Sequence, residues 1–129
     1  MTDPYDDLFI EEQEPKEAIA NTIKKFVKFS KNGEIIYEEK YETLNGKQKV
    51  LLHILTSKVL AARKLREQEG FRVQEISKIT GISVKSIEGY VYGQLKGFVQ
   101  SDTGRIFIPN YRINEVIKNL NTKGDDSDN

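Results

Sequence analysis

A short segment in the second half of the chain carries polar and small residues at the spacing of one helix face. Lys85, Gly89, Tyr92 and Lys96 recur every three or four residues between Ser83 and Lys96. At about 100° per residue, they lie together on one side of a helix. Lysine neutralises phosphate, tyrosine donates to a phosphate or packs against a sugar or a thymine methyl group, and glycine lets the backbone approach closely. The pattern indicates a surface for DNA.

The opposite side of the same predicted helix is apolar. Ile87, Val91 and Leu95 recur every four residues and form a stripe that we expect to be buried. Gly89 and Gly93 each cost roughly 1 kcal/mol of helix propensity, which some other contact must offset. Close approach to a partner is one explanation, and relief of packing against the preceding helix is the other.

Other polar side chains around this segment complete the candidate site. Ser83 stands at the N-cap position, where its hydroxyl accepts an early N–H, and Ser86 flanks the polar face. Arg105 stands beside a predicted hairpin turn, from which it can reach a phosphate or the minor groove; a solvated surface arginine is the alternative. The predicted DNA-binding residues are Lys78, Ser83, Lys85, Ser86, Gly89, Tyr92, Lys96 and Arg105.

Two helices and a hairpin must hold these residues in place. Residues 73–79 predict two turns of helix, followed by a turn at Thr80-Gly81-Ile82 in which Gly81 tolerates a positive φ. The second helix begins after Ser83. Residues 98–100 and 105–108 then predict the two strands of a hairpin.

Three motifs in this region, EISKITGIS, IEGYVYGQLKGFV and SDTGRIFI, resemble the winged helix-turn-helix family, and most of all the small archaeal regulators of that class. The resemblance covers roughly residues 45–121. It implies a fold that is mainly α with a small β-hairpin. It also implies that the helix at 83–96 enters the major groove, with the hairpin at 98–108 as the wing.

An N-terminal helix-strand extension, residues 16–44, precedes this domain. Apolar residues with helical spacing predict a helix over 16–29. Aromatic and β-branched residues predict a strand over 34–41. At the other end of the domain, a last helix is expected after the hairpin, with Asn114 as its cap.

A long helix is predicted from Gly46 to about Gln68. Asn45 and Gln48 have the spacing of a capping box, and Gly70 is placed to end the helix. The length exceeds that of an average globular helix, which leaves room for a dimer contact. His53 lies in this helix, and we expect it to be a surface or half-buried structural residue, because the chain has no second histidine and no cysteine to share a metal.

The formal net charge of +0 conceals a strong segregation. Residues 46–123 carry 14 basic and 6 acidic side chains, residues 1–45 carry 6 basic and 11 acidic ones, and residues 124–129 carry three Asp. A basic body suits a polyanion. The acidic ends either screen that body or recruit a second partner.

Both ends of the chain are predicted to be disordered because they are acidic and lack a periodic apolar pattern. Residues 1–15 form the arm, and residues 122–129 form the tail. Leu8-Phe9-Ile10 is an apolar island in the arm. It has two interpretations: a hydrophobic staple onto the body, or a docking motif within residues 5–12 for another protein.

The combined pattern predicts a sequence-specific double-stranded DNA-binding protein, a cytoplasmic and nucleoid-associated transcriptional regulator that acts as a homodimer. The alternative is a winged-helix adaptor that binds protein in a transcription or chromosome-organising complex. We expect neither an enzyme nor a cofactor, because the sequence has no Gly-rich phosphate loop, metal-ligand cluster or nucleophile–base pair. No apolar run is long enough to span a membrane, so no membrane partner is expected.

Overall fold

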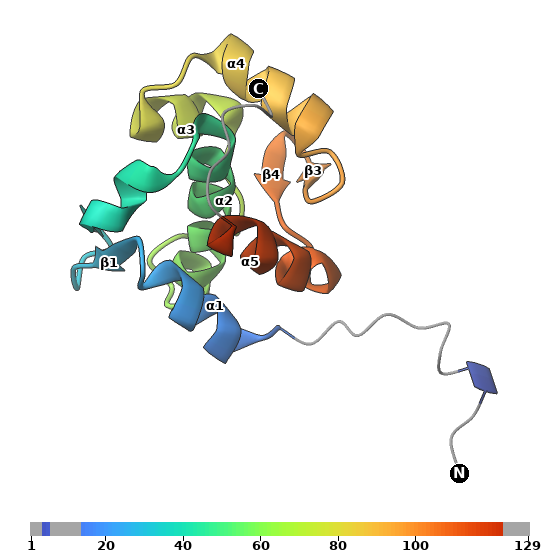
Figure 1. Ribbon diagram of the computed structural model, residues 1–129, viewed down its shortest axis with the longest axis horizontal. Helices are drawn as coiled ribbons and strands as arrows, with labels where there is room; N and C mark the ends of the chain where they lie inside the picture. The colour runs from blue at the N-terminus through green and yellow to red at the C-terminus, as the bar shows by residue number, and fades with distance from the viewer. Residues whose placement is uncertain (1–3, 6–13, 123–129) are drawn as a thin grey trace.

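The computed structural model describes residues 4–5 and 14–122, and the arm's Leu8-Phe9-Ile10 and nearly all of the predicted tail lie outside the described residues. The fold is mainly helical, with two small antiparallel hairpins (Figure 1). Its elements are α1 (Lys16–Ile23), β1 (Val27–Phe29), β2 (Ile35–Tyr37), the 3-10 helix η2 (Glu39–Thr43), α2 (Gly46–Ala62), α3 (Val73–Thr80), α4 (Val84–Gly89), the π-helical turn η3 (Tyr90–Gln94), β3 (Gln100–Asp102), β4 (Arg105–Phe107), the 3-10 helix η4 (Asn110–Arg112) and α5 (Ile113–Asn121).

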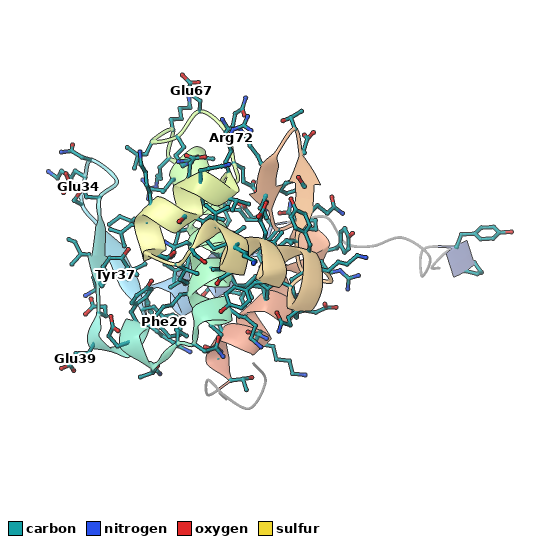
Figure 2. All side chains as sticks on the ribbon, turned by 90° about the horizontal axis from the view of Figure 1, so that it is seen from above. Phe26, Glu34, Tyr37, Glu39, Glu67 and Arg72 are labelled. Carbon is teal, nitrogen blue, oxygen red and sulfur yellow. The ribbon has the colours of Figure 1, made fainter. Side chains whose placement is uncertain are left out.

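The N-terminal extension differs from the expected helix and strand. Helix α1 ends at Ile23, and the last part of the expected helix forms β1, which pairs antiparallel with β2. The expected strand over 34–41 is shorter, because η2 follows β2. The apolar residues fit either structure, since Phe26 and Val27 are buried in the hairpin as they would be in a helix. Figure 2 shows Phe26 directed inward and Glu34 directed outward.

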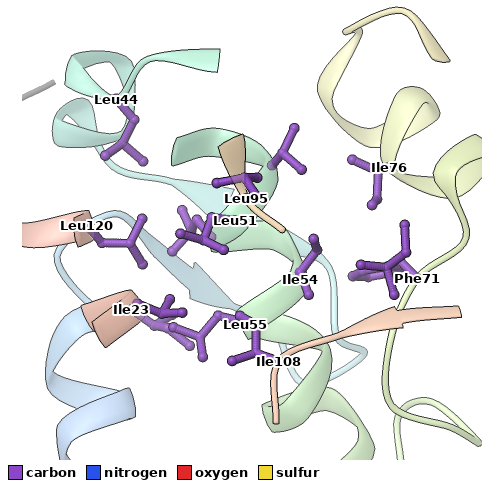
Figure 3. Packing of buried hydrophobic residues seen from close by; sticks show 14 of the residues in the cluster. Ile23, Leu44, Leu51, Ile54, Leu55, Phe71, Ile76, Leu95, Ile108 and Leu120 are labelled. Atoms are coloured by element: carbon purple, nitrogen blue, oxygen red, sulfur yellow. The ribbon is translucent and has the colours of Figure 1, made fainter. Parts of the chain in front are cut away.

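Helix α2 lies at the centre of the molecule and is buried on all sides. Leu51, Ile54 and Leu55 are completely buried. Figure 3 shows them at the centre of a cluster to which α1, α3, β4 and α5 also contribute. The extension therefore packs into the same core as the residues that follow it. No helix among the described residues is long and apolar enough to cross a membrane.

The start of α2 confirms the predicted capping box. The Asn45 side chain accepts the Gln48 N–H at 2.9 Å, and the Gln48 side chain accepts the Asn45 N–H at 3.1 Å. Gln48 Nε2 also donates to the carbonyl oxygens of Asn119 and Thr122, at 3.0 Å each. The cap therefore also fixes the end of α5 against α2.

The expected end of α2 at Gln68 is wrong, because the helix ends at Ala62. Lys64 adopts a left-handed φ of 59°, and the Leu65 N–H donates to the Leu60 carbonyl at 2.8 Å, which reverses the chain. Gly70 does not end the helix. Its N–H instead donates to Ser57 Oγ at 2.9 Å, and this bond ties the returning chain to α2.

Helices α3 and α4 are joined as the sequence predicts. Gly81 has a φ of +77°, and its N–H donates to the Ser77 carbonyl at 2.8 Å. Ser83 caps α4 by accepting the Ser86 N–H at 3.1 Å. The second helix is not regular to Lys96 as expected: after Gly89 it widens into η3, where the Leu95 N–H donates to the Tyr90 carbonyl five residues earlier.

The second hairpin has a different register from the expected one. The first strand is Gln100–Asp102, two residues later than predicted, and Asp102 pairs with Arg105. The turn contains only Thr103 and Gly104, with φ values of 51° and 83°. Two consecutive positive φ values define a type I′ turn, whose twist matches that of the two strands. The hairpin is therefore shorter and tighter than predicted.

Helix α5 confirms the expected last helix but not its predicted cap. Val116 and Leu120 are buried, and Ile117 is half-buried. The N-cap residue is Arg112 rather than Asn114, and its side chain makes no capping hydrogen bond. The reason is that η4 leads directly into α5, which moves the start of the helix before Asn114.

Candidate nucleic-acid interface

The two faces of α4 and η3 are separated as the helical spacing predicts. Ile87, Val91 and Leu95 are at most 3% exposed and form the buried stripe. Lys85, Gly89, Tyr92 and Lys96 are all exposed, with Tyr92 at 61%. We call these four residues the α4 stripe. The widened turn at η3 does not disturb the separation, because Val91 within it and Leu95 directly after it remain buried.

The glycines of this helix have no packing role among the described residues. A Cβ atom added at Gly89 or Gly93 would meet nothing within 4 Å. Relief of packing against the preceding helix is therefore the wrong explanation for them. Both residues are exposed, and they leave bare backbone between Lys85 and Lys96.

Three further predicted residues lie close to the α4 stripe. Lys78 is exposed in the last turn of α3. Ser83 is occupied by its capping role, since its hydroxyl accepts the Ser86 N–H and donates to Ser86 Oγ at 2.9 Å. The Ser86 hydroxyl accepts that bond and keeps its own proton for an outside acceptor. Lys85 and Lys96 form no ion pair with any residue that the structure describes.

Arg105 is placed differently from both interpretations of the sequence. Its guanidinium lies 3.9 Å from Glu75 of α3, and its side chain is only 28% exposed. Arg66 approaches the same carboxylate at 3.3 Å. Partial burial by itself raises the pKa of Glu75, but the hydrogen bonds from the Arg72 N–H and Arg66, with the charges of Arg66 and Arg105, lower it below its usual value. Arg105 therefore links the hairpin to α3.

Arg72 is the cation at the hairpin turn, a position that the sequence pattern does not predict. Its Nη1 atom is 2.7 Å from the position that a Cβ of Gly104 would occupy, so the guanidinium packs on the bare backbone of the turn. Figure 2 shows Arg72 beside the hairpin. The residue directly precedes α3, where Glu75 accepts its N–H at 3.0 Å. Only the folded hairpin brings it next to Gly104.

Four of the six basic residues in the 46–70 part of the basic body are buried or half-buried. Lys47 and Lys58 are buried, and Lys58 bonds Glu69 at 2.7 Å and Asn110 at 2.9 Å. Arg66 stacks on the Phe71 ring at 4.1 Å. Arg63 is exposed, but it lies at the far end of α2 from α4, about 25 Å along a helix of this length. These residues therefore do not extend the basic surface of the α4 stripe.

His53 is fully buried, which corrects the expected surface or half-buried position. A hydrogen bond of 3.1 Å joins its Nε2 atom to the Tyr41 hydroxyl. Burial lowers the pKa of His53 to about 4, so the ring is neutral near pH 7. No group of three or more His, Cys, Asp or Glu in the described part of the chain could hold a metal ion.

The site therefore consists of the exposed α4 stripe, with Lys78 and Ser86 beside it and Arg72 at the neighbouring hairpin turn. Its geometry offers two separated cations, an aromatic hydroxyl and exposed backbone. Comparisons of the chain with family models, with curated proteins and with solved structures find no match.

Proposed function

We propose that the chain is a winged helix-turn-helix protein that binds double-stranded DNA in a sequence-specific manner and regulates transcription. Helices α3 and α4 form the motif, and the β3–β4 hairpin is the wing. One observation carries the proposal: the α4 stripe is exposed and includes a glycine that no packing contact explains.

The dimensions of the α4 stripe suit the major groove. Lys85 and Lys96 are 11 residues apart, or about 16 Å along a helix, and the groove is about 12 Å wide. The two lysines can therefore contact phosphates on opposite sides of the groove. Gly89 and Tyr92 then face the base edges, where the bare backbone of Gly89 permits close approach.

One cation stands beside the tip of the wing in this arrangement. Arg72, held against Gly104, is directed to the flanking phosphates, while Arg105 keeps the hairpin attached to α3 through Glu75. Phosphate contacts of this kind set the position of the protein on the duplex, and base contacts set the sequence preference. Lys78 adds a further cation at the end of α3.

The test is a matched pair of charge reversals in the full chain. Lys85→Glu with Lys96→Glu changes the α4 stripe, and Lys16→Glu with Lys64→Glu makes the same change in net charge at exposed positions away from it, in the first turn of α1 and just after the end of α2. The first variant should lose about tenfold or more of its duplex affinity and reduce the slope of log affinity against log salt by about 2. The control should keep its duplex affinity within about threefold of the parent's and its slope of log affinity against log salt close to the parent's. Fluorescence anisotropy measures affinity, and circular dichroism checks folding. Equal effects of the two pairs would remove α4 as the DNA-binding helix.

The adaptor alternative is favoured by the centre of the α4 stripe. The two lysines are separated by exposed residues that carry no positive charge: Tyr92 at 61% exposure, two glycines and, beside them, Glu88. Tyrosine is enriched at protein interfaces, and a flat surface of this kind also accepts a partner helix. A stoichiometric protein partner that Tyr92→Ala releases, together with no duplex binding at low salt, would favour this function over the first.

A further inference from the structure

An apolar groove lies at the end of α2 that is distant from α4. Helix α1, strand β1 and the last turns of α2 form its walls, side by side in the lower half of Figure 1. The groove has a volume of about 700 Å³. Its apolar lining is Ile23, Val27, Phe29, Val59, Leu60 and Leu65. Leu65 is 44% exposed, so the apolar surface opens to solvent.

The rim of the groove is positively charged. Lys24, Lys28, Lys31 and Arg63 surround it, and no acidic residue lines it. Lys28 approaches Glu38 at 3.3 Å. The other three cations form no ion pair with any described residue. The groove therefore suits a short apolar segment that carries negative charges on both sides.

The chain itself contains such a segment. Residues 6–12 read Asp-Asp-Leu-Phe-Ile-Glu-Glu, with three large apolar side chains between two pairs of carboxylates. The composition of the segment complements that of the groove, whose lining combines apolar side chains with four cations and no carboxylate. Burial of three such side chains is favourable in an open apolar groove, and the carboxylates approach the rim from solvent without desolvation of either charge.

The length of the intervening chain permits the contact. Phe9 lies six positions before Pro15, which precedes α1, and an extended chain of six residue steps spans about 20 Å. Helix α1 has eight residues and is about 12 Å long. The segment can therefore turn back along α1 and place its apolar residues beside Ile23, at the end of that helix.

We propose that residues 6–12 bind in this groove of their own molecule, with Leu8, Phe9 and Ile10 on its floor and the acidic residues against its rim. A tether of a few residues gives the segment an effective concentration in the millimolar range. This favours the chain's own segment over that of a second copy at ordinary protein concentrations. The contact does not involve the α4 stripe, and its test is independent of DNA binding.

Disulfide trapping tests the contact directly, because the chain has no native cysteine. Ile10→Cys with Val59→Cys places one thiol in the segment and one in the groove. The matched control is Ile10→Cys with Asn121→Cys. Asn121 is exposed and accepts a hydrogen bond from Lys25 at 2.9 Å, so it lies within reach of the end of α1 but outside the groove.

The groove pair should form its disulfide within the monomer at least about tenfold faster than the control pair, because docking raises the local thiol concentration. Adding Leu8→Asp and Phe9→Asp should reduce the rate of the groove pair to that of the control. Equal rates for the two pairs would overturn the proposal. So would a disulfide formed only between molecules, which would assign the groove to the segment of a second copy.

A second measurement avoids changes in the groove. In the full chain without cysteines, Leu8→Asp with Phe9→Asp should shift the amide resonances of groove residues such as Lys28 and Val59, and leave those of α4 unchanged. Glu11→Gln with Glu12→Gln should produce a smaller shift at the same residues, because only part of the charge pairing is lost. Groove resonances that do not respond to either variant would also overturn the proposal.

Discussion

Helices α2 and α4 both contain polar and apolar residues, but α2 buries its polar residues and α4 exposes them. Twelve of the 17 residues of α2 are buried, including polar residues such as His53 and Lys58. In α4 and η3, burial is confined to one stripe, and the polar residues opposite are exposed. The two helices therefore differ in where their polar residues lie: α2 keeps most of them inside the core, and α4 presents them to solvent.

Lysine illustrates the difference most clearly. Lys58 of α2 is a structural residue that joins Glu69 and Asn110. Lys85 of α4 is exposed and forms no ion pair with a described residue. Net charge summed over a stretch of sequence therefore overestimates the surface available to a polyanion, because it counts both kinds of lysine equally.

The largest contrast should appear when one side chain is truncated in each helix. Leu51→Ala removes a fully buried side chain from α2 and should cost about 2–5 kcal/mol of unfolding free energy. Tyr92→Ala, at an exposed position, should change it by no more than about 0.5 kcal/mol while weakening duplex binding. Urea denaturation and anisotropy measure the two quantities. If both variants lost equal stability, the difference between the helices would not hold.

Between pH 6.5 and 4, α2 should contribute to the pH dependence of stability through His53. Burial holds the pKa of His53 at about 4, below its ordinary value of 6.5, so the folded state binds a proton less readily than the unfolded state. The contribution of the neutral His53 ring to the unfolding free energy is fully present above pH 6.5 and is lost as the pH falls toward 4. At about 1.4 kcal/mol per unit, the total is about 3 kcal/mol. Urea denaturation at a series of pH values gives the slope.

The matched control for this prediction is His53→Gln, which cannot titrate in that range. Its stability is expected to be lower than that of the parent at pH 7, because the contact with Tyr41 is altered. The slope between pH 6.5 and 4 should nevertheless largely disappear. A variant that kept the full slope would show that another group is responsible.

Replacing a lysine by methionine compares the two helices with a single chemical change. Lys58→Met keeps most of the buried side-chain volume but removes the bonds to Glu69 and Asn110, at a cost of about 1–3 kcal/mol. Lys85→Met should alter stability by less than about 0.5 kcal/mol and reduce duplex affinity. Thermal denaturation with anisotropy on the same samples separates the effects. A stable Lys58→Met protein with weaker duplex binding would reverse the assignment.

Features that depend on a few neighbouring residues could be predicted from the sequence. The capping box of Asn45 and Gln48, the left-handed Gly81 and the Ser83 cap each follow from local chemistry. The buried stripe of α4 follows from a four-residue repeat of large apolar side chains. No distant contact is needed for any of these, so the sequence determines them directly.

Features that depend on distant residues could not be predicted. Val27 fits a helix and a strand equally well, and its pairing with Tyr37 decides between them. The positive φ of Thr103 is unusual for a β-branched residue, so the two-residue turn had no sequence signal. In the site, Arg105 pairs with Glu75, and Arg72 takes the place at the hairpin turn. Contacts between segments some 30 residues apart decide which of these two arginines lies at the hairpin turn.

The smallest effect, and the sharpest test of α4, concerns Gly89. The residue has a helical φ of −59° and ψ of −41°, and a Cβ there would meet no described atom within 4 Å. Gly89→Ala should therefore raise the unfolding free energy by about 0.5–1 kcal/mol. If the backbone at this position approaches a duplex, the added methyl group should weaken binding while the protein becomes more stable. Gly93→Ala, also open but outside the α4 stripe, should have a smaller effect on binding. Denaturation and anisotropy on both variants give the comparison, and unchanged affinity in Gly89→Ala would assign this glycine no part in DNA binding.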